Sequence, residues 1–292
     1  MTGSAARPLV LLPALLALAV ACSQAPPPSP AHPPAAIPAP AAAPPPSPGR
    51  PAAPPPAAAT RPARPEAPVP FAAGEVLSYD VSWSSFVTAG TATLTVGNKK
   101  PSLGSTVYPI VAEGRSTALV SVFYPVYYKA DTLVDAYDLL PQRGSIYGEE
   151  KGAKKTRTAV FDQARHRARF ELRAETTTTR DLKVPAGVQD ALSAFYWLRS
   201  YPLRTGAKLL VPIVFNGTVV NVRITVGARE QVSSRLGPLT AWHLTPVVDD
   251  EGELEARKMS LWISDDARRL PLRMQVELPL GSFDLVLKAA MR

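Results

Sequence analysis

Residues 209–226 read LLVPIVFNGTVVNVRITV and give the clearest structural signal in the chain. Apolar residues recur at every second position on both sides of Asn216-Gly217, from Leu209 to Phe215 and from Thr218 to Val226. The Asn-Gly pair suits the two positive-φ positions of a tight hairpin turn. The stretch therefore predicts an antiparallel hairpin with Asn216 and Gly217 at its tip.

The same alternation of apolar and polar residues recurs elsewhere in the chain. A period of two is typical of a strand with one face buried and one face in water. Besides the hairpin, segments with this pattern are residues 75–83, 92–96, 168–172 and 283–287. The sequence therefore predicts an all-β, mainly antiparallel fold in which most strands pair with their sequence neighbours.

One segment breaks this pattern, because apolar residues between Ala191 and Leu198 fall at helical spacing. Asp190 is placed as an N-cap, and Pro202 ends the helix. About a dozen strands and one helix could close as a barrel, coil as an open spiral or stack as a sandwich. We expect a strongly curved open or spiral, barrel-like sheet with the short helix plugging or flanking its concave side. A β-sandwich is the alternative.

The first residues have the layout of a bacterial export signal. Residues 1–21 carry one positive charge, Arg7, followed by an apolar run from Leu9 to Val20. The run is too short to span a bilayer, which takes about 20 apolar residues, but it suits the core of a signal peptide. We therefore expect residues 1–21 to be a cleaved lipoprotein signal peptide.

The only cysteine of the chain, Cys22, directly follows this run. Residues 18–22, LAVAC, resemble the lipobox of bacterial lipoproteins, in which the Cys sulfur receives a diacylglyceryl group, although Ala19 stands where Leu is usual. Two acyl chains anchor a soluble domain stably. Because Ser23 rather than Asp follows the Cys, we expect a lipid anchor in the outer membrane and a domain facing the periplasm. Ordinary cleavage after Ala21, with an incidental thiol, is the alternative.

Residues 22–70 comprise the predicted lipidated Cys and a Pro/Ala-rich tether. Residues 23–70 contain 20 of the chain's 33 prolines. Such a segment lacks the large apolar groups of a core and favours extended polyproline II, so we expect it to be disordered. From Phe71 onward prolines are sparse, and the β-rich periplasmic domain is expected to span residues 71–292.

Three stretches of this domain resemble a known family. They are GEVLSYDVSW at residues 74–83, QDALSAFYWLR at residues 189–199 and LWISDDARRLPLR at residues 261–273. All three resemble segments of the bacterial domain-of-unknown-function family numbered 3108. The resemblance implies an exported, β-rich envelope domain with no assigned reaction.

Few side chains in the sequence suit catalysis. The three histidines, His32, His166 and His243, lack metal-ligand spacing, and no nucleophile elbow, phosphate loop or dinucleotide-binding motif occurs. Adjacent acids such as Asp265-Asp266 are typical of turns. We therefore expect no enzyme activity, no cofactor and no metal. A cell-wall or glycan hydrolase is a lesser alternative, because folding could bring distant carboxylates together.

Two groups of side chains are candidates for binding. Aromatic residues that converge on a concave face would suit a lipid, glycan or apolar peptide, with an ordinary core as the alternative. A row of arginines along one strand would suit anionic headgroups or wall polymers, with a solvated face as the alternative. The candidate ligand-contacting residues are Tyr79, Trp83, Tyr124, Tyr127, Tyr128, Trp197 and Trp242. The candidate anion-contacting residues are Arg165, Arg167, Arg169 and Arg173.

The sequence thus predicts a non-catalytic envelope lipoprotein whose β-domain binds or scaffolds an envelope component. A protein-interaction module that supports an envelope assembly is the alternative. The expected partners are a membrane, reached through Cys22, and a lipid, glycan or envelope protein. Nucleic acid is not an expected partner of an exported domain.

Overall fold

The computed structural model describes residues 65–84, 87–249, 258–278 and 281–292. The predicted signal peptide, Cys22 and most of the predicted tether lie outside these residues. The helices are α2 (Ala118–Ser121) and α3 (Ala191–Ser200). The strands are β1 (Val76–Trp83), β2 (Val87–Val96), β3 (Lys100–Ser102), β4 (Ser105–Ser116), β5 (Val126–Asp135), β6 (Pro141–Glu150), β7 (Ala153–Asp162), β8 (Arg167–Arg173), β9 (Thr177–Lys183), β10 (Lys208–Phe215), β11 (Thr218–Ser234), β12 (Gly237–Asp249), β13 (Lys258–Ser264), β14 (Pro271–Leu278) and β15 (Gly281–Met291).

These strands form one continuous antiparallel sheet. Its order is β10-β11-β12-β13-β14-β15-β1-β2-β4-β5-β6-β7-β8-β9, and β3 pairs with β4. Most strands pair with their neighbours in sequence, but β1 pairs with β15, so that Tyr79 lies opposite Leu287. The predicted all-β antiparallel fold is confirmed. The β-sandwich alternative is wrong, because a single sheet accounts for every strand named above.

The predicted hairpin is present as β10 and β11. Phe215 pairs with Thr218 across the turn, and Leu209 pairs with Ile224 farther along. Asn216 and Gly217 adopt φ values of 47° and 78°. These left-handed conformations match the tight turn that the Asn-Gly pair predicted.

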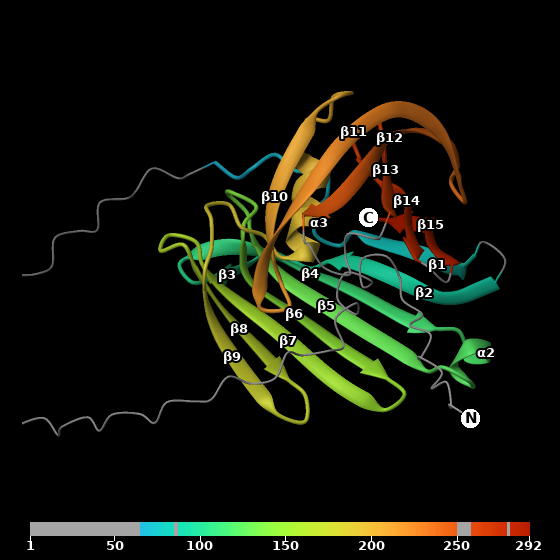
Figure 1. Cartoon of the computed structure of the whole chain (residues 1–292). Helices are drawn as coiled ribbons and strands as arrows, with labels where there is room; N and C mark the ends of the chain where they lie inside the picture. Colours follow the sequence, from blue (N-terminus) through green and yellow to red (C-terminus); the bar gives the residue numbers. More distant parts are fainter. Residues whose placement is uncertain (1–64, 85–86, 250–257, 279–280) are drawn as a thin grey trace, which may run out of the picture. The chain divides into compact units, whose positions relative to one another are not determined.

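The sheet curls so strongly that β10 lies against the inner side of β7 and β8 (Figure 1). Val214 of β10 packs in one apolar cluster with Phe161 and Ala168. At the hairpin tip, a Cβ on Gly217 would lie 2.8 Å from the Phe170 ring, so only glycine allows this approach. Strands β10 and β9 stand at opposite ends of the pairing order. The sheet is therefore an open spiral rather than a closed barrel.

The predicted helix is α3. The Asp190 carboxylate accepts hydrogen bonds from the backbone N–H of Leu192 and of Ser193, each at 2.9 Å, as an N-cap does. Leu192, Phe195 and Leu198 are buried, and the helix packs against β5 and β10. It lies inside the curl (Figure 1), as the sequence predicted.

Two details differ from the sequence-based expectation. The four-residue helix α2 was not predicted, because one helical turn is too short to show a period. Contacts with the sheet also begin before Phe71: Lys99 pairs with Glu66 at 2.8 Å, and the N–H of Ala67 donates to Ala136. In the described part of the chain, no helix combines the length and hydropathy needed to cross a bilayer.

Candidate functional site

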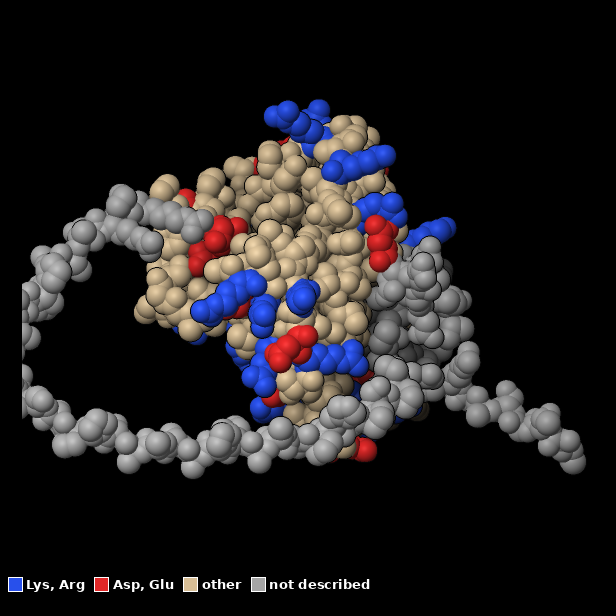
Figure 2. All heavy atoms as spheres, turned by 60° about the vertical axis from the view of Figure 1, so that its left-hand side comes forward, with Lys and Arg blue, Asp and Glu red and all other residues tan. Residues whose placement is uncertain are grey.

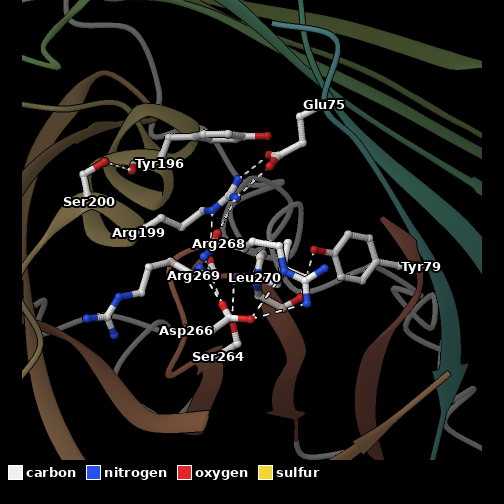
Figure 3. A network of polar contacts seen from close by, with 11 residues as sticks. Glu75, Tyr79, Tyr196, Arg199, Ser200, Ser264, Asp266, Arg268, Arg269 and Leu270 are labelled. Atoms are coloured by element: carbon white, nitrogen blue, oxygen red, sulfur yellow. Dashed lines mark hydrogen bonds and ion pairs between the residues drawn. The ribbon is translucent and has the colours of Figure 1, made fainter. Parts of the chain in front are cut away.

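A buried ion pair fixes the end of α3 (Figure 3). The Arg199 side chain has no exposed surface, and that of Glu75 exposes 5%. The two form a bidentate pair, with Nη1 2.6 Å from Oε1 and Nη2 3.0 Å from Oε2. Burial alone would lower the pKa of Arg199, but the hydrogen bond to Glu75, together with the charge interactions with Glu75, Tyr196 and Tyr79, raises that pKa. The guanidinium therefore stays charged inside the domain.

Further contacts hold the same guanidinium in place. Arg199 Nε donates to the carbonyl of Arg269 at 3.1 Å, and Nη2 donates to the carbonyl of Arg268 at 3.3 Å. The rings of Tyr196 and Phe71 lie 5.0 and 5.5 Å from the guanidinium carbon. Both distances suit cation–π attraction, which is strongest where water is excluded.

The turn that supplies these two carbonyls is itself pinned by Asp266. Its carboxylate accepts hydrogen bonds from the N–H of Arg268 and of Arg269, at 3.0 and 3.1 Å, and from the Ser264 hydroxyl at 2.7 Å. Burial opposes ionisation of Asp266, but the hydrogen bonds from Ser264 and Arg268 and the positive charge of Arg268 together lower the pKa of the carboxyl. The turn that the adjacent acids Asp265 and Asp266 predicted is thus present between β13 and β14.

The network joins the three stretches that carry the family resemblance. Glu75 belongs to the first, Arg199 to the second, and the carbonyls of Arg268 and Arg269 to the third. In Figure 3, Arg199 reaches between Glu75 and the turn that carries Arg268 and Arg269. These contacts hold the end of α3 in place beside the turn between β13 and β14.

An apolar cavity of about 120 Å³ lies between α3 and the inner face of β10–β14. We call it the helix cavity. Ser260 and Gln275 are the polar residues of its lining. The Ser260 hydroxyl already contacts His243 Nε2 at 3.1 Å. The lining residues are Ala191, Ala194, Phe195, Leu198, Val211, Ile213, Val222, Ile224, Pro246, Met259, Ser260, Leu261, Met274, Gln275 and Val276. A pocket of this make-up suits an apolar group and offers little for orienting a polar one.

A smaller and more polar cavity, of about 60 Å³, lies on the other side of the first turn of α3. Arg157, Asp190 and Asn216 contribute to its lining. Burial raises the pKa of Asp190, although hydrogen bonds from Thr132, at 2.7 Å, and from the helix N–H groups oppose the rise. A Cβ on Gly144 would lie 2.7 Å from Asp190 Oδ2. The helix start therefore fits tightly against β5 and β6.

The candidate aromatic residues are spread around the sheet and do not line one shared cavity. Tyr79, Tyr124, Tyr128 and Trp242 are buried, whereas Trp83, Tyr127 and Trp197 are half-buried. Most are engaged locally: the Tyr79 hydroxyl donates to Pro271, that of Tyr127 to Glu113, that of Tyr128 to Glu150, and the Trp242 indole to Asp265. Trp83 stacks on Phe283, and Trp197 contacts Tyr201. Tyr124 alone among them lines a described cavity, a small one beside β2 and β4.

The candidate arginines lie on or beside β8, on its outer face. Alternate residues of this strand, such as Ala168 and Phe170, are buried while the arginines are exposed, as the sequence predicted. Acidic partners accompany three of them: Arg165 pairs with Asp162, Arg169 with Asp181 and Arg173 with Glu171. Figure 2, in which the β8–β9 side comes forward, shows basic and acidic side chains interleaved rather than one basic field.

The sequence reasoning missed the helix cavity, although part of its signal was present. Ala191, Ala194, Phe195 and Leu198 were recognised as the apolar face of a helix. Which strands this face would meet depends on the curl, and that is not visible in local periodicity. Among the described residues, no three His, Cys, Asp or Glu side chains gather so that they could hold a metal ion.

Comparisons with known proteins agree with this architecture. The model of the family "Protein of unknown function (DUF3108)" matches residues 78–288, which is most of the chain. A β-barrel-like protein of the domain of unknown function DUF1849 from Brucella abortus is 13% identical, with a TM-score of 0.53 over 77% of this chain and 98% of that one. This likeness shows a shared fold alone. No curated protein matches the chain.

Two further solved structures are less similar. An exported protein with a YmcC-like fold, from Bacteroides fragilis, is 12% identical, with a TM-score of 0.32 over 78% of this chain and 100% of its own. A protein described as a lipoprotein, from Parabacteroides distasonis, is 9% identical, with a TM-score of 0.33 over 77% of this chain and 100% of its own. With TM-scores this low, neither structure supports an inference about the present chain.

Proposed function

The chain belongs to the DUF3108 family of proteins of unknown function, and from this premise we propose that its domain binds an apolar chain in the helix cavity. The ligand class is an envelope lipid, whose acyl chain enters the cavity while its polar end remains outside. The domain would hold this lipid without converting it. It would work in the periplasm, anchored to the outer membrane by acyl chains on Cys22.

The observation that carries this proposal is the lining of the helix cavity. Thirteen of its fifteen lining residues are Ala, Val, Leu, Ile, Met, Phe or Pro. An apolar cavity of about 150 Å³ stays dry and takes up small apolar molecules, and the helix cavity, at about 120 Å³, is close to this size. It therefore suits a segment of an acyl chain rather than a whole lipid. Each methylene that leaves water contributes about 0.8 kcal/mol.

The buried pair of Arg199 and Glu75 supports the same proposal. Because the pair and its two carbonyl partners fix the end of α3, the helix wall of the cavity is in place before a ligand arrives. A preformed site loses less conformational entropy on binding than one that must be assembled. Met259 and Met274 on the opposite wall are flexible side chains, which can adapt to chains of different shape.

Filling the cavity tests the proposal. Binding of the fluorescent fatty acid cis-parinaric acid would be measured for the unmodified protein, for Ala194→Phe and for Met259→Trp. These changes fill the cavity from the helix side and from the sheet side. The matched control is Ala174→Phe at an exposed turn. We expect each filling variant to weaken binding at least about tenfold, which corresponds to ~1.4 kcal/mol, and the control to bind normally.

A second measurement asks whether a natural ligand is present. The protein would be purified from its host envelope without detergent exchange and its lipids identified by mass spectrometry. Acyl lipids that copurify with the unmodified protein, but not with Ala194→Phe, would support the proposal. Unchanged binding of cis-parinaric acid by both filling variants, with no lipid in the purified protein, would refute it.

A further inference from the structure

Three large apolar side chains are exposed together beyond the end of β4. Leu119, Val122 and Phe123 expose 73%, 74% and 80% of their surface. They lie on α2 and the turn after it, which we call the α2 tip (residues 118–123). Single exposed apolar residues are ordinary on soluble domains, but a cluster of them marks an interaction surface.

The α2 tip is a well-held turn rather than a loose loop. Val120 packs against the core, and its N–H donates to Thr117 Oγ1 at 3.4 Å. The Ser121 hydroxyl lies 2.7 Å from that of Ser116, whose oxygen also accepts a hydrogen bond from the N–H of Val126 at 3.1 Å. Local hydrogen bonds thus hold the backbone while the large apolar side chains point into water.

Basic side chains stand beside this apolar tip. Lys151, in the turn between β6 and β7, donates its N–H to Pro125 at 3.3 Å, and its ammonium lies 4.5 Å from the centre of the Tyr124 ring. Arg115 at the end of β4 and Lys154 at the start of β7 are exposed. Three exposed basic residues therefore lie at strand ends and in a turn on the same side of the sheet's end as the α2 tip, with Lys151 in contact with Pro125 and Tyr124.

The acidic residues that precede Lys151 are less available to solvent. Glu149 and Glu150 on β6 are half-buried. Their carboxylates accept hydrogen bonds from the hydroxyls of Tyr147 and Tyr128. The acids beside the α2 tip are therefore less exposed than Arg115, Lys151 and Lys154.

We propose that the α2 tip inserts into the interface of a membrane rich in anionic lipids. Leu119, Val122 and Phe123 would enter the boundary between headgroups and acyl chains. Arg115, Lys151 and Lys154 would face the phosphates. Apolar burial and attraction to anionic headgroups are the two terms that hold a protein at such an interface. This contact does not depend on the helix cavity, so either proposal can fail alone.

A label at the tip tests this insertion. In the full chain, Cys22→Ser removes the only thiol, and Phe123→Cys then accepts a single environment-sensitive nitrobenzoxadiazole dye. The matched control is Leu103→Cys, which is also 80% exposed but lies before β4, at the opposite end of that strand. Vesicles of phosphatidylethanolamine and phosphatidylglycerol, with or without brominated acyl chains, would be added to each.

We expect the dye at position 123 to shift to shorter wavelength and to be quenched by brominated chains, while the dye at 103 stays in water. Unlabelled Leu119→Ser/Phe123→Ser protein should float with these vesicles at least tenfold less, with unchanged circular dichroism. Neutral phosphatidylcholine vesicles should bind the tip more weakly.

Three results would overturn the proposal. The first is an equal response of the two dyes, and the second is flotation that the Ser substitutions leave unchanged. The third is a shift of the dye at 123 that grows with protein concentration in the absence of vesicles, because that would make the tip a protein contact. Raising the salt concentration should weaken tip insertion, since the headgroup attraction is screened.

Discussion

Breaking the buried pair of Arg199 and Glu75 is predicted to destabilise the domain strongly. Glu75→Leu would leave a guanidinium with no exposed surface and no counter-charge. Removal of one partner of a buried ion pair typically costs about 3 to 5 kcal/mol. For a domain of this size, such a loss lowers the unfolding midpoint by roughly 6 to 20 °C. Arg199→Met should cost a similar amount, because it strands the carboxylate and also removes the donors to Arg268 and Arg269.

The double variant Glu75→Leu/Arg199→Met measures how much of the loss comes from the interaction between the two side chains. Replacing both partners with apolar residues of similar volume is often neutral for buried pairs. Glu75→Leu/Arg199→Met should therefore lose less stability than the sum of the two single losses. The two carbonyls left without their donor still cost about 1 to 3 kcal/mol each, which limits the recovery. A coupling energy of about 3 kcal/mol between the two positions is the expected result.

Urea unfolding followed by tryptophan fluorescence measures this cycle. The slope of free energy against urea should be shared by all four proteins, so that midpoints report stability. Arg165→Met, which breaks an exposed pair with Asp162, is the control and should leave the midpoint unchanged. Single-variant losses below about 1 kcal/mol, or losses that simply add in the double variant, would show that the pair does not lock α3 in place.

Three further predictions concern Gly144, Asp190 and Cys22. Gly144→Ala places a methyl group against Asp190 and should lower the urea midpoint and weaken cis-parinaric acid binding. An unchanged midpoint together with unchanged binding would contradict the tight fit of the helix start. Because burial raises the pKa of Asp190, the folded domain holds this proton more tightly than the unfolded chain, so stability should fall as pH rises from the unfolded pKa toward the raised one. Asp190→Asn should flatten that slope in urea titrations across the acid range, while a slope identical to that of the unmodified protein would exclude Asp190 as its source. After a high-salt wash, which screens the contact of the α2 tip with anionic headgroups, Cys22→Ser should move the protein from the membrane fraction to the soluble fraction of its host. Unsubstituted protein found in the soluble fraction would argue against the lipid anchor.

Local patterns in the sequence predicted the elements well. The period of two in residues 75–83 places Leu77, Tyr79 and Val81 in the core, where they are buried. Asn216-Gly217 forms the expected turn, and Asp190 caps the expected helix. Each of these features depends on residues close together in the chain, so each leaves a local trace.

Features that depend on the curl of the sheet left no such trace. Glu75 and Arg199 are 124 positions apart in the chain, and no pattern in either segment predicts that the two side chains form an ion pair. The helix cavity exists because α3 faces β10–β14. That arrangement depends on how strongly the sheet curls, which local sequence patterns do not show. The sequence left open whether the aromatic residues converge on one concave face or belong to an ordinary core. Tyr79 and Trp242 lie on β1 and β12, well apart in the order of strands. The alternation of apolar and polar residues predicts which side chains are buried, but it does not predict where each strand lies around the spiral.

The pairing of β1 with β15 has a consequence for how this chain is made. β1 (Val76–Trp83) has β15 (Gly281–Met291) as one of its two neighbours, and β15 follows every other strand along the chain. While β15 is not yet available, β1 and β14 each have one unpaired edge. The strands therefore cannot all pair in the order in which they occur along the chain. Unpaired edges of this kind expose a partly folded chain to association with other chains until β15 is in place.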